Sequence, residues 1–139
     1  MRSTVNAMNK SLHHHSVEDY MTRTPHTLGK AQPAAKAKEL MRELQIRHLP
    51  VLDGGKLVGV VSDRDIKVAE SFRGAGELSV EEVMSADPYA VRADTSLKVV
   101  VTEMVRHKYG CAIVEDAHHK VIGIFTDIDG LKALSEHLG

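Results

Sequence analysis

The sequence is poor in cysteine and in aromatic residues. Its 139 residues include one cysteine, two Phe, three Tyr and no Trp. A single cysteine excludes a disulfide within the chain and agrees with the reducing cytoplasm. So few aromatic rings leave little for the base-stacking surfaces of proteins that bind single-stranded nucleic acid.

A strong excess of one charge and a long apolar run are lacking as well. The formal net charge is −1 and the basic residues are scattered, whereas nucleic-acid-binding proteins show a basic stripe. No stretch approaches the roughly 18 apolar residues that a membrane-spanning helix needs. Residues 1–16 contain no apolar core of a secretory signal. We therefore expect a small cytoplasmic protein without a membrane partner, for which nucleic-acid binding is the weakest of the functions considered.

The N-terminal residues are polar and predict a mobile tail over 1–15. This segment contains the tract His13-His14-His15, whose imidazoles could bind a metal. No Cys or carboxylate supports a structural zinc site there, so we interpret the tract as solvated and expect no metal site.

The clearest positive feature of the sequence is an internal repeat. Residues 17–21 return as 80–84, Pro25 returns as Pro88, and residues 59–65 return as 123–129. The offset is 63 residues at first and 64 after one residue is inserted at 117–119. Such a repeat indicates a duplicated structural unit. Each copy, at about 60 residues, is marginal alone, so we expect two copies packed on a pseudo-two-fold axis, with paired clefts between them.

Local patterns predict the same order of elements in both copies. The first copy is predicted to contain a helical turn at 17–21, an extended segment at 24–27, a helix at about 33–45, strands at 48–52 and 56–62 around a turn at 53–55, and a helix at 63–70. In the second copy an N-cap at 94–96 opens a helix, followed by strands at about 111–115 and 120–125 and a helix at 127–137. The core-facing stripes of the central helices are expected to be Ala34, Ala37, Leu40, Met41 and Leu44, and then Leu97, Val100, Val101, Met104 and Val105.

These elements give each copy the order β-α-β-β-α, which predicts an α+β (mixed α/β) fold class. We place repeat 1 at 16–71 and repeat 2 at 79–139. The segment 72–78 between them contains Gly74 and Gly76 and is expected to be a linker.

The order of elements and two sequence phrases resemble the CBS domain family. The phrases are Ile46-Arg47-His48-Leu49-Pro50-Val51 and the segment 59–65, which recurs at 123–129. Residues 17–137 are similar to one tandem CBS pair, also called a Bateman module, of the free-standing bacterial type. The resemblance implies a homodimer with no required cofactor. It also implies regulation of an unknown partner protein through an adenosyl ligand: AMP, ADP, ATP, S-adenosylmethionine or NAD.

Each repeat places a hydroxyl and a carboxylate three residues apart where a strand becomes a helix. These pairs are Ser62 with Asp65 and Thr126 with Asp129. The free N–H groups of a helix N-terminus and the hydroxyl suit a phosphate, and the carboxylate can accept hydrogen bonds from the vicinal hydroxyls of a ribose, as in other nucleotide folds. The alternative is that each pair is only a capping box, and the residues alone leave both interpretations open.

The resemblance implies that each cleft takes residues from both repeats. The first cleft would be lined by Ser62, Arg64, Asp65, Asp87, Pro88, Tyr89, Tyr109, Gly110 and Cys111. The second would be lined by Thr24, His26, Thr27, Ile46, Arg47, His48, Thr126, Ile128 and Asp129. Main-chain groups of the strands would bind the adenine edge. Arg47, His48 and Arg64 could neutralise phosphates, although Arg47 and His48 also suit a solvated strand edge.

The two copies differ at positions that matter for these clefts. Ile128 replaces the cation of Arg64, and Ile113 stands where the family usually has a proline. Cys111 has no base at catalytic spacing and is expected to be a half-buried strand residue, so we expect no enzymatic activity. His118 and His119 are expected to face solvent. A CBS scaffold that only mediates oligomerisation or partner binding is the alternative to a ligand sensor.

Overall fold

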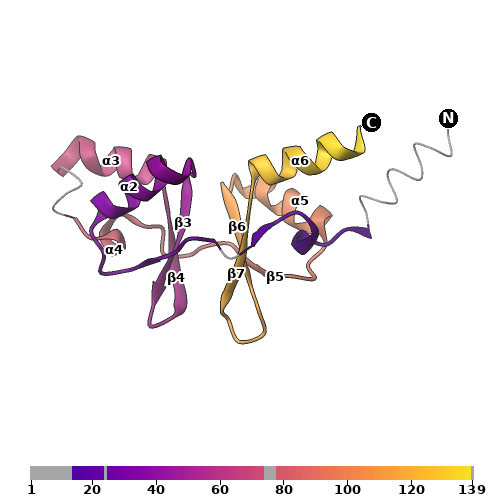
Figure 1. Ribbon diagram of the computed structural model, residues 1–139, viewed down its shortest axis with the longest axis horizontal. Coiled ribbons are helices and arrows are strands. Elements are labelled where there is room, and N and C mark those ends of the chain that lie inside the picture. Colours follow the sequence, from indigo (N-terminus) through magenta and orange to yellow (C-terminus); the bar gives the residue numbers. More distant parts are fainter. Residues whose placement is uncertain (1–13, 24, 74–77, 139) are drawn as a thin grey trace. The chain divides into compact units, whose positions relative to one another are not determined.

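The computed structural model describes residues 14–23, 25–73 and 78–138. Most of the predicted tail, Thr24 and linker residues 74–77 therefore lie outside the described residues. The elements, in order, are η1 (Val17–Asp19), β1 (Thr22–Arg23), β2 (Leu28–Gly29), α2 (Ala34–Leu44), β3 (His48–Asp53), β4 (Lys56–Ser62), α3 (Asp63–Arg73), α4 (Val80–Val83), β5 (Ala90–Arg92), α5 (Leu97–His107), β6 (Cys111–Glu115), β7 (Val121–Thr126) and α6 (Asp127–His137) (Figure 1). The predicted order β-α-β-β-α is confirmed in β2-α2-β3-β4-α3 and in β5-α5-β6-β7-α6.

The chain divides into two compact units whose limits differ from those of the sequence repeats. Among the described residues, one unit, which we call the β2–β4 unit, comprises 25–73, 78–88 and 119–121. The other, the β5–β7 unit, comprises 14–23, 89–118 and 122–138. The segment that opens each sequence repeat thus belongs to the unit built mainly from the other repeat. We call residues 17–23 the first lead segment and residues 80–85 the second.

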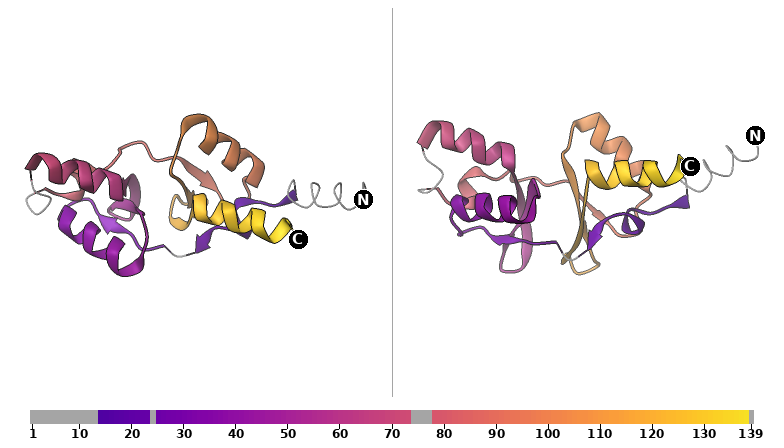
Figure 2. Two further views of the ribbon diagram at one scale, coloured as in Figure 1. Left: turned by 90° about the horizontal axis from the view of Figure 1, so that it is seen from above. Right: turned by 45° about the horizontal axis from the view of Figure 1, so that its top comes forward.

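A three-stranded sheet forms the centre of the β2–β4 unit. Its strand order is β2-β3-β4, with β2 parallel and β4 antiparallel to β3. The predicted hairpin turn is confirmed: Asp53 pairs with Lys56, and Gly54 and Gly55 have φ angles of 57° and 83°. A two-residue turn of this hand requires positive φ at both central positions, which glycine adopts without a steric cost. The turn projects away from α2 and α3, which lie side by side (Figures 1 and 2).

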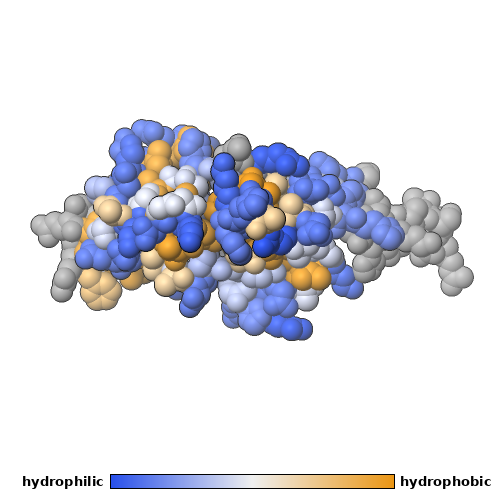
Figure 3. All heavy atoms as spheres, turned by 90° about the horizontal axis from the view of Figure 1, so that it is seen from below, coloured by the Kyte–Doolittle hydropathy of each residue, from blue (hydrophilic) through white to orange (hydrophobic). Residues whose placement is uncertain are grey.

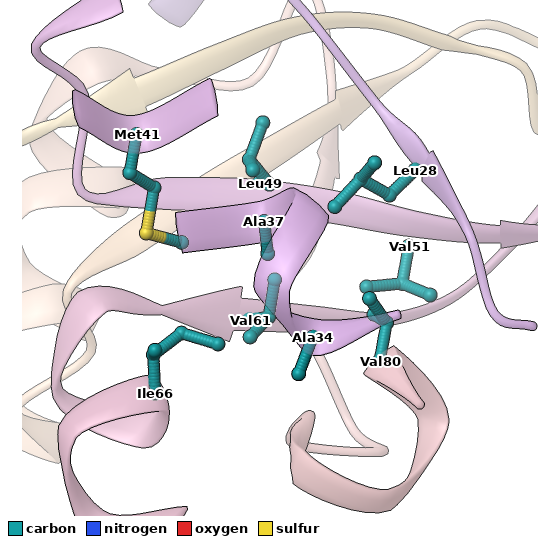
Figure 4. Packing of buried hydrophobic residues seen from close by; sticks show 9 residues of the cluster. All are labelled: Leu28, Ala34, Ala37, Met41, Leu49, Val51, Val61, Ile66 and Val80. Carbon is teal, nitrogen blue, oxygen red and sulfur yellow. The ribbon is translucent and has the colours of Figure 1, made fainter. Parts of the chain in front are cut away.

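The core of the β2–β4 unit fills the space between its helices and its sheet (Figure 4). Residues 49–51 of β3 are buried in succession, as expected for a strand covered on both faces. The second lead segment contributes Val80, which is fully buried. Its backbone pairs with β4, where Ser85 N–H donates to the Val60 carbonyl at 2.9 Å and Val60 N–H donates to the Ser85 carbonyl at 3.1 Å.

A four-stranded sheet forms the centre of the β5–β7 unit. Its strand order is β1-β7-β6-β5, with β5 parallel to β6 and β1 antiparallel to β7. The first lead segment supplies β1, in which Thr22 pairs with Ile124, and also the fully buried Val17. The cluster of buried residues is Val17, Met21, Leu97, Val100, Met104, Ala112, Val114, Phe125 and Ala133.

The predicted apolar stripes are confirmed except at their C-terminal ends. Leu97, Val100 and Met104 of α5 are buried, but 79% of Val105 is exposed. At 3.6 residues per turn, Val105 lies about a quarter of a turn from the row that faces the sheet. Leu44, the last residue of α2, is also exposed. The stripe prediction was therefore wrong for these two residues.

The surface drawn in Figure 3 shows hydrophobic side chains in small patches among hydrophilic ones. Across the described part of the chain, no helix is both long and apolar enough to span a membrane.

Candidate functional site

In the β2–β4 unit, the predicted junction of strand and helix lies at Ser62. Strand β4 ends at this residue and α3 begins at Asp63. Ser62 N–H donates to Asp65 Oδ2 at 2.9 Å, and Asp65 N–H donates to Ser62 Oγ at 3.0 Å. This reciprocal pair is a capping box, so the capping interpretation of the motif is confirmed here.

The matching junction in the β5–β7 unit lies at Thr126, between β7 and α6. Thr126 N–H donates to Asp129 Oδ2 at 2.9 Å, again as part of a capping box. The other oxygen, Asp129 Oδ1, accepts a hydrogen bond from the hydroxyl of Thr22 at 3.3 Å. Asp129 is only 6% exposed.

Capping uses only part of the hydrogen-bonding capacity of each carboxylate, because two carboxylate oxygens offer about four acceptor positions. Within the described residues, no donor reaches Asp65 Oδ1. Asp65 can therefore cap α3 and accept a hydrogen bond from a sugar hydroxyl at the same time. The capping role and the ligand role of these aspartates do not exclude each other.

The start of β3 lies next to the start of α3 within the β2–β4 unit. His48 is opposite Ser62 in the antiparallel ladder, and Asp63 N–H donates to the Arg47 carbonyl at 2.9 Å. A hollow of about 510 Å³ lies here between α2 and α3, lined by Lys38, Met41, Arg42, Gln45, Ile46, Arg47, Asp63, Ile66, Lys67 and Glu70. Two residues predicted for the second cleft, Ile46 and Arg47, thus face this hollow.

The charge around this hollow is positive on balance. Lys38 pairs with Glu70 at 2.6 Å and Lys67 pairs with Asp63 at 3.5 Å. The two arginines of the lining, at 42 and 47, form no ion pair with any described residue. A guanidinium of this kind is free to bind a phosphate with two parallel hydrogen bonds.

Arg64 and Asp65 face a different hollow of the same unit. It measures about 300 Å³ and is lined by Arg64, Asp65, Val68, Ala69, Phe72, Leu78, Glu82 and Val83. Asp65 thus lines a different hollow from Ile46 and Arg47.

The predicted residues near the start of β6 include a stack of rings. The Tyr89 and Tyr109 rings are 5.0 Å apart between centroids and 22° from parallel, and the His107 ring also stacks on Tyr109 at 5.1 Å. Burial is the main cause that raises the pKa of Tyr89, followed by the charge of Glu103 and by Tyr109. Sequence reasoning named both tyrosines but not their stacking, which depends on β5 pairing with β6.

Cys111 is more buried than the sequence suggested. Its side chain is 5% exposed rather than half-buried, because residues 111–114 of β6 are buried in succession. Burial raises the pKa of this thiol to about 12. With so high a pKa the thiol stays protonated near neutral pH, which makes it a weak nucleophile.

The other described residues that were predicted for the two clefts are exposed or partly exposed. Arg64, Asp87 and His26 are exposed, Pro88 and Thr27 are partly exposed, and 55% of Ile128 is exposed. Both predicted clefts draw residues from both units, so their assembly stays a prediction. Thr24 lies outside the described residues.

In the described ranges, no group of three or more His, Cys, Asp or Glu side chains could hold a metal ion. His118 and His119 are exposed at the turn between β6 and β7, as the sequence predicted.

Sequence reasoning missed Thr22, whose hydroxyl contacts Asp129. The signal that could have found it is the repeat itself: Met21-Thr22 returns as Met84-Ser85, so a hydroxyl residue follows methionine in both lead segments. Its contact with Asp129 depends on the pairing of β1 with β7, which no local pattern predicts.

Comparison with known proteins identifies the repeated unit. The CBS domain family model matches the chain twice, at residues 17–71 and 80–136. The homoserine O-acetyltransferase of Methanocorpusculum labreanum is 33% identical over 112 residues, which cover 80% of this chain. The chain spans 22% of the length of that enzyme.

Three solved structures share the fold over most of both chains. The crystal structure described as that of an acetoin utilization protein (AcuB) from Vibrio cholerae is 40% identical, with a TM-score of 0.81, and the match covers 89% of this chain and 93% of that one. CBSX2 of Arabidopsis thaliana, solved in complex with AMP, is 29% identical, with a TM-score of 0.75 and coverage of 88% and 97%. The CBS domain pair of protein MJ0100, in complex with 5′-methylthioadenosine and S-adenosyl-L-methionine, is 25% identical, with a TM-score of 0.81 and the same coverage.

Proposed function

Because this chain belongs to the CBS domain family and carries the domain twice, we propose that it is a regulatory module that binds an adenosyl compound. The observation that carries this proposal is the repeated junction, in which a hydroxyl residue and an aspartate open α3 and α6. The asymmetry of the two carboxylates matters for affinity, since Asp65 keeps one oxygen free for a sugar hydroxyl. The complexes of CBSX2 with AMP and of MJ0100 with adenosyl ligands support this choice of ligand class.

The proposed roles follow from the chemistry of each residue. Ser62 and Thr126, with the free N–H groups of their helices, are assigned to phosphate or to another polar group beyond the ribose. Asp65 and Asp129 are assigned to the ribose hydroxyls. The starts of β3 and β6 are assigned to the adenine, with Ile46, Arg47 and His48 in one set and Tyr109, Gly110 and Cys111 in the other.

We assign no chemical reaction to this module. Its proposed output is a change in the population of arrangements that a partner protein recognises, because a ligand shifts an equilibrium toward the state that it binds more tightly. Arg47 and Arg64, which are exposed, would favour phosphorylated ligands over uncharged nucleosides.

Isothermal titration with AMP, ATP and S-adenosylmethionine tests the proposal. Saturable binding at the mutated carboxylate is expected to weaken at least about 10-fold in Asp65→Asn or Asp129→Asn, since each variant loses a charged acceptor of a hydrogen bond. Asp127→Asn is the matched control. This residue also opens α6, but among the described residues its Oδ1 accepts a hydrogen bond only from the neighbouring Ile128 N–H, at 2.9 Å.

Absence of saturable binding for all three compounds, in folded protein freed of co-purified nucleotide, would contradict the proposal. The alternative is then a scaffold that associates through its helices. Exposed hydrophobic residues of α6 give this alternative a specific basis: Leu131 is 60% exposed and Leu134 is 46% exposed.

A further inference from the structure

The two aspartates assigned to ribose differ in one hydrogen bond. In the β5–β7 unit, Thr22 Oγ1 donates to Asp129 Oδ1 at 3.3 Å, and Asp129 is 6% exposed. In the β2–β4 unit, no described donor reaches Asp65 Oδ1, and Asp65 is partly exposed. In one copy of the motif, a carboxylate oxygen therefore accepts no hydrogen bond from a described residue. In the other copy, both carboxylate oxygens accept one.

The backbone around the two motifs does not account for this difference. Thr22 pairs with Ile124 on β7, and Ser85 pairs with Val60 on β4. These two pairs are equivalent in the repeat, so each lead segment brings a hydroxyl residue to the same place in its sheet. The Ser85 hydroxyl nevertheless forms no hydrogen bond with Asp65. A threonine is stiffer at χ1 than a serine because of its branched Cβ, which favours one fixed direction for the Thr22 hydroxyl.

The first lead segment holds Thr22 firmly in position. Met21 is 8% exposed and lies against Gly123, where any Cβ would collide with its sulfur. Tyr20 Oη lies 2.8 Å from His137 Nε2 near the end of α6. The segment is thus fixed by the two residues that precede Thr22, whose hydroxyl contacts the first turn of α6.

We propose that Thr22 is a positioning residue that occupies the Asp129 carboxylate in the ligand-free protein. An adenosyl ligand then binds first at Asp65, and a ligand at Asp129 has to replace the Thr22 hydroxyl with one of its own sugar hydroxyls. This inference rests on the proposed function. The contact suits such an exchange, because 3.3 Å is longer than the roughly 2.7–2.8 Å typical of an O–H···O hydrogen bond.

The proposal predicts an affinity gain at one site only. In an Asp65→Asn background, which leaves Asp129 as the working carboxylate, Thr22→Val removes the competing hydroxyl with little change in shape. The affinity for AMP, measured by titration calorimetry, is expected to rise about 2- to 10-fold, as expected for loss of one competing hydrogen bond. Thr22→Ser in the same background keeps a hydroxyl but loses the branched Cβ that fixes its direction, so its affinity is expected to lie between those of Asp65→Asn alone and Asp65→Asn/Thr22→Val. Ser85→Ala is the matched control at the equivalent position and should leave the affinity unchanged.

The outcomes separate this inference from the proposed function. Equal affinity in Asp65→Asn with and without Thr22→Val overturns the role of Thr22, and so does a loss of affinity, which would make Thr22 a direct ligand contact. If the wild type binds AMP but neither double variant does, the inference fails while the proposed function stands. If the wild type binds none of AMP, ATP and S-adenosylmethionine, the proposed function fails and the inference with it. Thermal unfolding of each variant confirms that it is folded.

Discussion

At the scale of single residues, burial determines the pKa of Cys111 and the hydrogen bonding that Asp129 needs. Cys111 has a thiol whose pKa is raised to about 12 because burial disfavours the charged thiolate. Asp129 is buried but keeps hydrogen-bond donors at both oxygens, as a buried carboxylate requires. Asp65 is partly exposed and has no second donor among the described residues. Exposure and one hydrogen bond thus distinguish the two copies of the motif.

The raised pKa of Cys111 predicts a dependence of stability on alkaline pH. Above the ordinary thiol value of 9.0 the unfolded chain loses a proton that the folded protein keeps, so the unfolded state binds fewer protons and the free energy of unfolding falls as pH rises. The loss approaches about 1.4 kcal/mol per pH unit between the two pKa values. Other groups titrate in this range, so denaturant unfolding at pH 8 to 11 should be compared between the wild type and Cys111→Ala. The difference in stability between them should shrink as pH rises, and a constant difference would contradict the burial.

The same burial predicts slow alkylation of the native protein by iodoacetamide at pH 8, and fast alkylation after unfolding. Rapid modification of the folded chain would show that the thiol is accessible.

At the scale of elements, each lead segment is held against its sheet by a glycine. Gly59 of β4 faces the second lead segment, where a Cβ would lie 2.5 Å from Met84 Sδ and 2.7 Å from the Ser85 carbonyl oxygen. Gly123 of β7 faces the first lead segment, where the three atoms nearest to a Cβ all belong to the side chain of Met21. Both positions need glycine because the lead segment lies too close to the strand for a Cβ. The atoms that a Cβ would meet differ in how easily they can move away.

This difference predicts unequal costs of substitution. Gly59→Ala is expected to lower the free energy of unfolding by about 1–3 kcal/mol, since the carbonyl can yield only if the segment shifts. Gly123→Ala should cost less, because a methionine side chain can change rotamer. Denaturant unfolding measures both.

Gly130→Ala is the control for the glycine pair. A Cβ at this position in α6 meets Phe125 only at ordinary contact distance, 3.6 Å. Alanine in a helix interior is favoured over glycine by roughly 0.5–1 kcal/mol, so the variant should be as stable as the wild type or more stable. Equal losses for Gly59→Ala and Gly123→Ala would contradict the proposed contrast.

At the scale of the whole molecule, the two halves of the sequence exchange their lead segments. Val17 lies in the core of the unit built from the second repeat, and Val80 lies in the core of the unit built from the first. Each is fully buried, and burying such a side chain contributes roughly 1.5–3 kcal/mol. A chain cut at the linker would therefore remove a buried residue from each core. Neither repeat alone contains the complete core of a unit.

Exposed hydrophobic residues on α6 and just beyond it predict self-association of the whole chain. Ile128, Leu131 and Leu138 are 55%, 60% and 66% exposed, and apolar residues gathered on one face of a helix often mark an interface. We expect a homodimer by size-exclusion chromatography with light scattering, and a shift toward monomer in the double variant Leu131→Ser/Leu138→Ser. Lys132→Ser on the same helix is the control and should remain dimeric. A wild type that is monomeric at high micromolar concentration would contradict this expectation.

Much of this protein was determined by local patterns in its sequence. The glycine pair 54–55 specified the hairpin turn, the hydroxyl and carboxylate pairs specified the starts of α3 and α6, and the repeat specified that each element occurs twice. These features depend on residues a few positions apart, so the chain itself brings them into contact. The family resemblance, now confirmed by the match to the CBS domain model, rests on the same phrases.

Only the tertiary structure decided which segments meet. The exchange of lead segments, the contact of Thr22 with Asp129 over 107 residues of sequence, the stacking of Tyr89 on Tyr109 and the full burial of Cys111 all depend on pairing between distant strands. A period of two or of 3.6 residues shows which face of a strand or helix is apolar, but it contains no information about the partner of that face. The sequence therefore determined what each element is and which groups open its helices. Long-range packing decided which of those groups form further hydrogen bonds, as Asp129 does with Thr22.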